Sequence, residues 1–322
     1  MFLLRLCVLL FLPHTLLAAT DISAELGSAQ TLLSTGDYSA AYVAYQRVAQ
    51  EHNSPLAQFT VGMFYDQGWG RPMDRAEACR WYEKAAAGDI PAAAHFLGEC
   101  LLEGIHQPAN PQSAAQWFQK AAGLGHYSSL CSLGELYVSG VGVAQDRAKG
   151  LALCKQAAER GVLSATERMG QFYLEAEGEQ RDLAMAVQWF TQAARANSAR
   201  AQYQLGLMLR EGQGQAVDLA AARYWFESAA SQGYISAYFP TAALYYETPK
   251  DADSGLWPEQ ELAKAYLWLS ATKQRSTKPD QQKQVAIMLE QVLAVMPISW
   301  VKDLDSKVAE HLALQASPAP AG

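Results

Sequence analysis

A glycine recurs along this chain at a constant interval of 36 residues, at Gly62, Gly98, Gly134, Gly170 and Gly206. Glycine makes up about 7% of an average chain, so chance does not produce this spacing. A pair of alanines keeps the same interval and begins at Ala85, Ala121, Ala157, Ala193 and Ala229. A tryptophan does so at Trp81, Trp117, Trp189 and Trp225, with Leu153 in the third slot. A period between 20 and 50 residues is typical of repeat proteins whose units stack side by side.

The fifth unit, residues 201–233, indicates what one repeat folds into. Its first segment, AQYQLGLMLREG, carries apolar or small residues at the spacing of an amphipathic helix. A glycine-rich turn follows, and then Asp218, whose carboxylate can accept from the free N–H groups of a helix's first turn. The next segment, AAARYWFESAASQG, ends at Gly233, a residue type that commonly terminates helices. Each unit is therefore predicted to consist of helix A, a turn, helix B and a second turn.

Further columns, meaning residues at the same position of successive repeats, predict where these helices begin, end and cross. The N-cap column is Asp74, Asn110, Asp146, Asp182 and Asp218, and the column of helix ends is Gly125, Gly161, Asn197 and Gly233. Glu77, three residues after Asp74, predicts a reciprocal capping box there. The glycine column lies in the middle of an apolar helix face, where glycine costs about 1 kcal/mol relative to alanine. We therefore predict that it permits close crossing of two helices.

The repeats follow the pattern AQYxLGxxYxxGxG, then Asp, then A-x-x-W-Y/F-x-x-AA-x-x-G. This pattern resembles the Sel-1-like repeat family, a relative of the tetratricopeptide repeat. The resemblance covers residues 55–236 as five repeats. It implies an all-α, right-handed α-solenoid of stacked antiparallel helix pairs. Residues 20–54 resemble a tetratricopeptide-like helical hairpin, and residues 237–275 a sixth, irregular repeat. Residues 276–314 are predicted to be two capping helices with a polar outer face, and residues 315–322 a disordered tail.

The first residues of the chain predict its destination. Residues 1–19, MFLLRLCVLLFLPHTLLAA, combine a positive start at Arg5, a short apolar core and small residues at a cleavage point, the pattern of a secretory signal peptide. A retained membrane anchor needs about 20 apolar residues, and here Pro13 and His14 interrupt the stretch. No later segment is predicted to span a bilayer. We therefore expect a periplasmic or secreted protein with a cleaved signal peptide.

The mature chain carries four cysteines, Cys79, Cys100, Cys131 and Cys154, and an even number in an exported chain favours disulfides. Cys79 lies about eight residues before the end of one predicted helix and Cys100 about eight after the start of the next. Antiparallel neighbours place such residues at the same height. Cys131 and Cys154 are arranged likewise around a turn. We predict the disulfides Cys79–Cys100 and Cys131–Cys154, with four buried free thiols as the alternative.

The non-core positions of helix A predict a polar, acidic stripe along the stacked repeats. Residues three or four apart lie on one helix face, and stacking aligns these faces. A solenoid without catalytic groups usually works through its extended surface, so the stripe is predicted to bind a basic or polar segment of a protein of the cell envelope. An ordinary solvated surface is the alternative. The predicted partner-binding residues are Gln67, Glu99, Glu103, Glu135, Gln171, Glu175, Gln204 and Glu211.

No catalytic group, cofactor or metal is predicted. The segment SATK, residues 270–273, matches the Ser-x-x-Lys motif of penicillin-interacting serine enzymes, but the companion Lys-Thr-Gly and Ser-Asp-Asn motifs are missing. His95 and Glu99 lie four residues apart and could share a metal with Glu103 and His106. A solvated helix face is the preferred interpretation of that group.

The leading prediction is an exported repeat scaffold that mediates protein–protein interaction in the cell envelope without catalysis of its own. A net charge of −7 and an isoelectric point near 5.4 argue against nucleic acid as a partner. The alternatives are a cell-wall-related enzyme and a peptidoglycan- or carbohydrate-binding protein, the latter suggested by Trp69, Trp257 and Trp300. The family resemblance adds one remote case, a β-lactamase-like cysteine-rich repeat protein.

Overall fold

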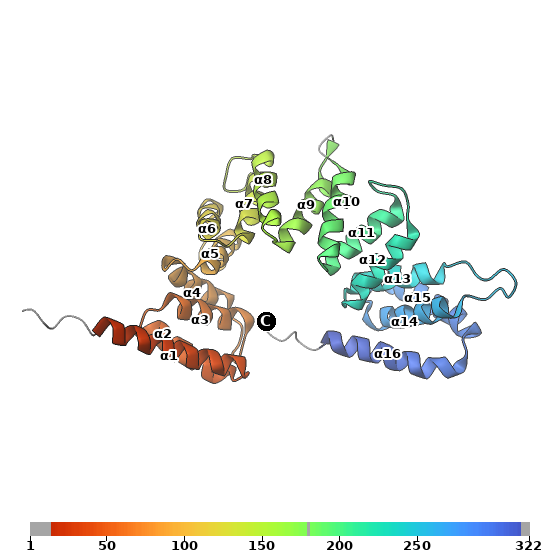
Figure 1. The fold of residues 1–322 in the computed structure, drawn as a ribbon, viewed down its shortest axis with the longest axis horizontal. Helices are drawn as coiled ribbons and strands as arrows, with labels where there is room; N and C mark the ends of the chain where they lie inside the picture. Colours follow the sequence, from red (N-terminus) through yellow and green to blue (C-terminus); the bar gives the residue numbers. More distant parts are fainter. Residues whose placement is uncertain (1–13, 179–180, 317–322) are drawn as a thin grey trace, which may run out of the picture. The chain divides into compact units, whose positions relative to one another are not determined.

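The structure is a computed structural model that describes residues 14–178 and 181–316. Within those residues the only regular elements are helices, so the predicted all-α class is confirmed (Figure 1). The helices are α1 (His14–Ser34), α2 (Tyr38–Glu51), α3 (Pro55–Gln67), α4 (Arg75–Ala87), α5 (Pro91–Glu103), α6 (Pro111–Gly123), α7 (Ser128–Ser139), α8 (Arg147–Glu159), α9 (Leu163–Glu175), α10 (Leu183–Arg195), α11 (Ala199–Glu211), α12 (Leu219–Ser231), α13 (Ile235–Tyr246), α14 (Glu259–Arg275), α15 (Pro279–Val295) and α16 (Ile298–Ala316). None of these described helices is long and apolar enough to cross a membrane.

The described helices form two compact units, α1–α8 and α9–α16, divided after Val162. In each unit, helix A of a repeat packs on helix B of the same repeat, as α3 does on α4 and α11 on α12, and helix B packs on the next helix A. Residues 1–13 of the predicted signal peptide (1–19) and residues 317–322 of the predicted tail (315–322) lie outside the described residues. Both stay predictions.

The column glycine of helix A makes room for an aromatic ring of helix B. A Cβ atom added at Gly98 would lie 2.6 Å from Cε1 of Phe118, whose side chain is buried. The predicted close crossing is thereby confirmed, and the structure identifies the group that fills it. The four pairs of this kind are Gly62–Tyr82, Gly98–Phe118, Gly170–Phe190 and Gly206–Phe226.

The third repeat replaces the ring with a cysteine. Cys154 stands in the aromatic column, and a Cβ added at Gly134 would instead lie 2.5 Å from the carbonyl oxygen of Gly150. Cys154 is bonded to Cys131, with an S–S distance of 2.02 Å and the Cα atoms 4.0 Å apart. The second predicted disulfide, Cys79–Cys100, joins α4 to α5 with the Cα atoms 5.9 Å apart. Both predicted pairings are confirmed.

The N-cap column behaves as predicted in all five repeats. Oδ1 of each cap residue accepts from the backbone N–H three residues further on, at 2.9–3.0 Å. The N–H of each cap residue donates to the carbonyl oxygen nine residues earlier, at 2.7–3.3 Å, which closes the turn between helix A and helix B. The predicted capping box at Asp74 is wrong, because its N–H is already bound to Tyr65 and the Glu77 carboxylate accepts from Arg80 at 2.7 Å.

The ends of helix B also follow the sequence columns. Gly125, Gly161, Asn197 and Gly233 have φ values of +99°, +84°, +66° and +84°. This left-handed conformation is available to glycine, and to asparagine more readily than to most residues. The helix stops there, and the chain turns into the next repeat.

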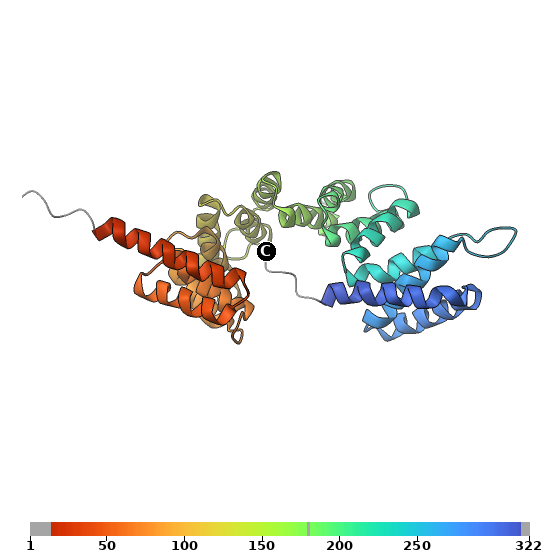
Figure 2. The same ribbon diagram turned by 60° about the horizontal axis from the view of Figure 1, so that its bottom comes forward.

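Both ends of the described chain carry helices beyond the five regular repeats. At the start, α1 packs on α2, and at the other end α13 and α14 form a sixth pair separated by a long insertion. Trp257 anchors that insertion, since its indole N–H donates to the carbonyl oxygen of Tyr246 at 2.8 Å. The last two helices, α15 and α16, both pack on α14 (Figure 2).

Replacing Gly98 by alanine should destabilise the first unit by about 1–3 kcal/mol, because the added methyl group meets the buried Phe118 ring. Gly123, the last residue of α6, is a matched control: a Cβ there meets nothing within 4 Å. Gly123→Ala should therefore leave the stability unchanged or raise it slightly. Urea denaturation followed by circular dichroism measures both, and equal midpoints for the two variants would contradict the packing argument.

Candidate functional site

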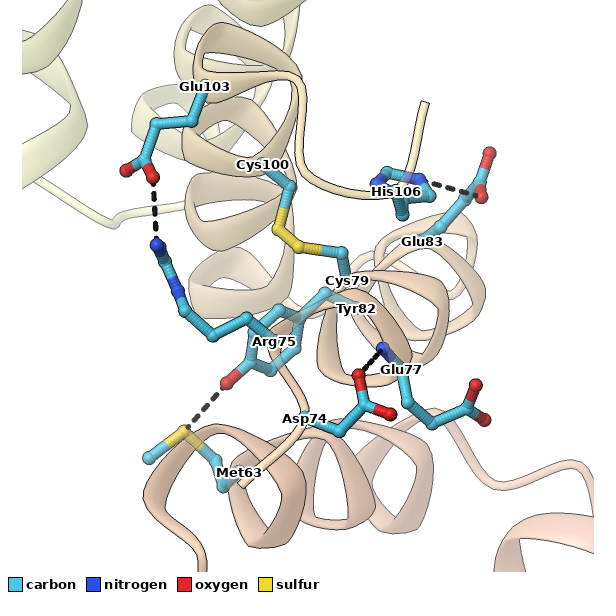
Figure 3. The surroundings of a disulfide bond; sticks show 10 residues. All are labelled: Met63, Asp74, Arg75, Glu77, Cys79, Tyr82, Glu83, Cys100, Glu103 and His106. Atoms are coloured by element: carbon cyan, nitrogen blue, oxygen red, sulfur yellow. Dashed lines mark hydrogen bonds and ion pairs between the residues drawn. A yellow bond between two sulfur atoms is a disulfide. The ribbon is translucent and has the colours of Figure 1, made fainter. Parts of the chain in front are cut away.

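Four predicted stripe residues lie in the first unit, and acidic side chains gather there around Arg75. The guanidinium of Arg75 lies 2.9 Å from Oε2 of Glu103 (Figure 3). The hydrogen bond to Glu103 raises the pKa of Arg75, and the charges of Glu103, Asp66 and Glu99 raise it further. Three carboxylates from α3 and α5 thus act on one cation. We call Asp66, Glu99 and Glu103 the α3–α5 acidic patch.

Asp66 was not among the predicted residues, whereas its neighbour Gln67 was. The structure has Gln67 exposed at the end of α3, where its side-chain amide donates to Oδ2 of Asp66 at 3.0 Å. Gln67 therefore supports a carboxylate of the patch. Nε2 of His95 lies 3.3 Å from Oε1 of Glu99. Glu135 is partly exposed on α7.

Aromatic side chains lie close to the acidic patch. The rings of Phe59, Tyr82 and Phe96 contact one another with centroids 5.1–6.1 Å apart, and the Tyr82 hydroxyl donates to Sδ of Met63 at 3.4 Å. Burial raises the pKa of Tyr82, and the charges of Asp66 and Glu99 raise it further, so the phenol stays protonated. Phe59, Met63 and Phe96 are partly exposed. The surface therefore combines negative charge with accessible apolar groups.

The other predicted stripe residues lie in the second unit and are largely satisfied within it. Gln171 and Glu175, one turn apart on α9, are hydrogen-bonded to each other. Gln204 is partly exposed on α11. Glu211 accepts from its neighbour Arg210 at 3.1 Å and from Gln213 at 2.9 Å. The second unit thus carries its own polar surface, with less uncompensated charge than the α3–α5 acidic patch.

The histidines of the second repeat separate into two environments. Oγ of the buried Ser129 lies 3.0 Å from Nδ1 of His95 and 2.9 Å from Nδ1 of His126, which links α5 to the start of α7. His106 lies elsewhere, next to the Cys79–Cys100 disulfide. The group of His95, Glu99, Glu103 and His106 considered from the sequence is therefore not gathered into one metal site.

The three tryptophans that suggested carbohydrate binding pack against the protein. Trp69 stacks on Tyr38 with ring centroids 6.0 Å apart, and it lies nearly perpendicular to the ring of Phe64. Trp257 is buried, and Trp300 packs against the core that α13–α16 share. They therefore do not form a shared aromatic platform.

The Ser-x-x-Lys segment lies beside a groove between α14, α15 and α16. Ser270 and Lys273 line this groove of about 670 Å³ together with Tyr266, Leu289 and Asp305. The Tyr266 hydroxyl donates to Oδ1 of Asp305 at 2.8 Å. Burial raises the pKa of Tyr266, and the bond to Asp305 raises it further, so this phenol is held protonated and is a poor general base.

Successive helix pairs with a shared cap, crossing and turn in every repeat define an α-solenoid repeat protein. The Sel1 repeat model matches residues 55–89, 91–126, 128–162, 163–198 and 199–234, more than half of the chain. The chain therefore belongs to the Sel1 repeat family. Proteins of this family are generally non-catalytic scaffolds that mediate protein interactions.

Solved structures agree with this family. A Sel1 repeat protein from Oxalobacter formigenes is 28% identical, with a TM-score of 0.63 over 78% of this chain and 100% of that chain. The protein c5321, a protective antigen present in uropathogenic Escherichia coli strains, is 23% identical, with a TM-score of 0.62 over 92% of this chain and 65% of that one. The second likeness concerns the fold alone. No curated protein matches this chain in sequence.

The stability of the chain should fall as the pH drops below about 6.5, in part through His126. Burial lowers the pKa of His126 from its ordinary value of 6.5, and the charge of His95 lowers it further, against a smaller opposite effect of Glu99. The unfolded chain then binds more protons than the folded chain below pH 6.5, so acid favours unfolding. Urea midpoints at pH 7.5 and pH 5.5 should differ more for the wild type than for His126→Gln. An equal pH effect in both would contradict this assignment.

Proposed function

We propose that this protein is an exported scaffold that binds a protein or peptide partner in the cell envelope and has no catalytic activity of its own. The observation that carries the proposal is the α3–α5 acidic patch, where three carboxylates act on the single cation Arg75. The partly exposed rings of Phe59 and Phe96 lie close by, packed against Tyr82. A basic segment with apolar side chains complements such a surface.

Export is supported by two independent features. Residues 1–19 have the signal-peptide pattern, and disulfides such as Cys79–Cys100 and Cys131–Cys154 persist in oxidising compartments such as the periplasm. The partner is therefore sought in the envelope.

The enzymatic alternative has a groove lined by Ser270 and Lys273 of the Ser-x-x-Lys motif, but the companion Lys-Thr-Gly and Ser-Asp-Asn motifs are missing from the sequence. Tyr266, which lines the same groove, has a raised pKa and donates to Asp305, so it is a poor base for Ser270. The glycan-binding alternative lacks an aromatic platform at Trp69, Trp257 and Trp300, which pack against neighbouring side chains. The scaffold function fits the described residues better than either alternative.

Removing the charge of the stripe should abolish capture of the partner. The test variant changes Glu99, Glu103, Glu175 and Glu211 to glutamine, and wild type and variant serve as baits for an extract of the cell envelope. A second variant with Asp66→Asn added tests the patch residue that the structure identifies. Partner recovery should fall at least tenfold for the first variant and further for the second, and it should weaken with rising salt because exposed charges are screened.

A matched control removes the same number of charges elsewhere. Glu51, Glu159 and Glu310 changed to glutamine, with Asp303→Asn, alter exposed acids on α2, α8 and α16. This control should still recover the partner. Equal recovery by the stripe variant, or equal loss by the control, would show that these helix A faces are not the binding surface.

The exported chain should begin near residue 20 and contain no free thiol. Intact-mass measurement on protein from a periplasmic extract, with thiol titration after denaturation, checks both points. A full-length chain retained in the cytoplasm, or four reactive thiols per chain, would overturn the assignment to the envelope.

A further inference from the structure

One of the two disulfides has a histidine beside it, and the other does not. The sulfur atoms of Cys79 and Cys100 and a ring nitrogen of His106 all lie within 4.8 Å of one another. These are the only His, Cys, Asp and Glu residues in the described part of the chain that gather in a group of three or more able to hold a metal ion. Cys79 and Cys100 come from α4 and α5, and His106 from the turn that follows α5.

The imidazole of His106 is buried beside the carboxylate of Glu83. Its side chain is 5% exposed, and neither ring nitrogen has a hydrogen-bond partner among the described residues. Nε2 lies 3.5 Å from Oε2 of Glu83, and Figure 3 shows the two side chains facing each other beside the disulfide. A buried ring nitrogen without a hydrogen bond costs free energy, and a ligand at Nδ1 would satisfy it while Glu83 faces Nε2.

We propose that reduction of the Cys79–Cys100 disulfide converts this place into a zinc site, with both thiolates and Nδ1 of His106 as ligands. Two sulfurs and one imidazole nitrogen are a ligand set that Zn²⁺ prefers, and the fourth tetrahedral position is left for water or a partner's ligand. Glu83 takes the carboxylate position common beside zinc-bound histidines, where it accepts from Nε2–H and fixes the tautomer that leaves Nδ1 free.

The conversion is balanced with a dithiol as the reductant. The dithiol delivers two electrons and two protons, the S–S bond breaks, and the reductant becomes a disulfide while Cys79 and Cys100 become thiols. Zinc binding then releases the two thiol protons. Tetrahedral coordination separates the two sulfurs to roughly 3.8 Å. Cα atoms 5.9 Å apart allow this through side-chain rotation.

The Cys131–Cys154 pair provides an internal control. Its Cα atoms are 4.0 Å apart, and within the described residues it belongs to no group with a histidine or a carboxylate that could hold a metal. Reduction of that pair is expected to yield two thiols without a third ligand. Zinc bound after reduction should therefore depend on the first pair alone.

The test measures zinc retained by the full chain after removal of free metal, with and without prior reduction by a phosphine. The reduced wild type should retain one zinc per chain and the oxidised wild type none. Cys131→Ser/Cys154→Ser should retain one zinc when reduced, whereas His106→Gln should weaken binding at least tenfold and Glu83→Gln about tenfold. Cobalt in place of zinc should show a thiolate-to-metal absorption band that His106→Gln alters.

Three results would overturn the proposal: no zinc on the reduced chain, equal affinity in His106→Gln, or zinc retained by the oxidised chain. Circular dichroism of each variant before metal addition establishes that it is helical. If reduction alone lowers the helical signal, zinc should restore it in the wild type but not in His106→Gln. The proposal can therefore be tested even if reduction partly unfolds the chain.

Discussion

The close crossing of helix A and helix B is the constraint on which the rest of each repeat depends, and in four of the five regular repeats a contact between a helix A glycine and a helix B ring makes it. A ring of roughly 150–250 Å² buried at about 25 cal/mol per Å² contributes roughly 4–6 kcal/mol as an upper bound. Glycine inside a helix costs about 1 kcal/mol relative to alanine. Burial of the ring outweighs the cost of the glycine, so the crossing is favoured. This crossing recurs in four repeats, with the buried rings of Tyr82, Phe118, Phe190 and Phe226. Once this crossing is set, the cap residue and the turn follow at fixed distances along the chain.

The third repeat shows that the crossing can be held by a different interaction. With Cys154 in the aromatic column, no ring separates α7 from α8, and the backbones approach through Gly134 and Gly150. The disulfide to Cys131 then joins the two helices covalently. By constraining the unfolded chain, a cross-link that closes a loop of this size stabilises the folded state by about 3 kcal/mol. This is comparable to the stabilisation lost with the buried ring. The repeat therefore keeps its geometry with a different source of stability.

The fold could be predicted because each of its determinants is repeated in the sequence at one interval. Cap residues such as Asp218 and crossing glycines such as Gly206 follow from helical register, and register also paired the cysteines, while their oxidation was inferred from their even number in an exported chain. The site was less predictable: register predicts Gln67 as a binding residue, whereas the neighbouring Asp66 carries the charge that acts on Arg75. His106 lies in an irregular turn, where helical periodicity does not predict the position of a side chain. Only the folded structure shows that it lies beside Cys100. The division after Val162 falls on the boundary between the third and fourth repeats, and nothing in the repeat pattern distinguishes that boundary from the others.

The Cys79–Cys100 disulfide connects stability to the proposed binding surface. It joins α4, which begins with Arg75, to α5, which ends with Glu103, and these two residues form the ion pair of the acidic patch. An exposed ion pair of this kind contributes about 0–1 kcal/mol and cannot hold two helices in place by itself. The cysteines belong to the same apolar cluster as Tyr82, against which Phe59, Met63 and Phe96 pack. The arrangement of charge and apolar groups on this surface therefore depends on the covalent link beneath it more than on the charges themselves.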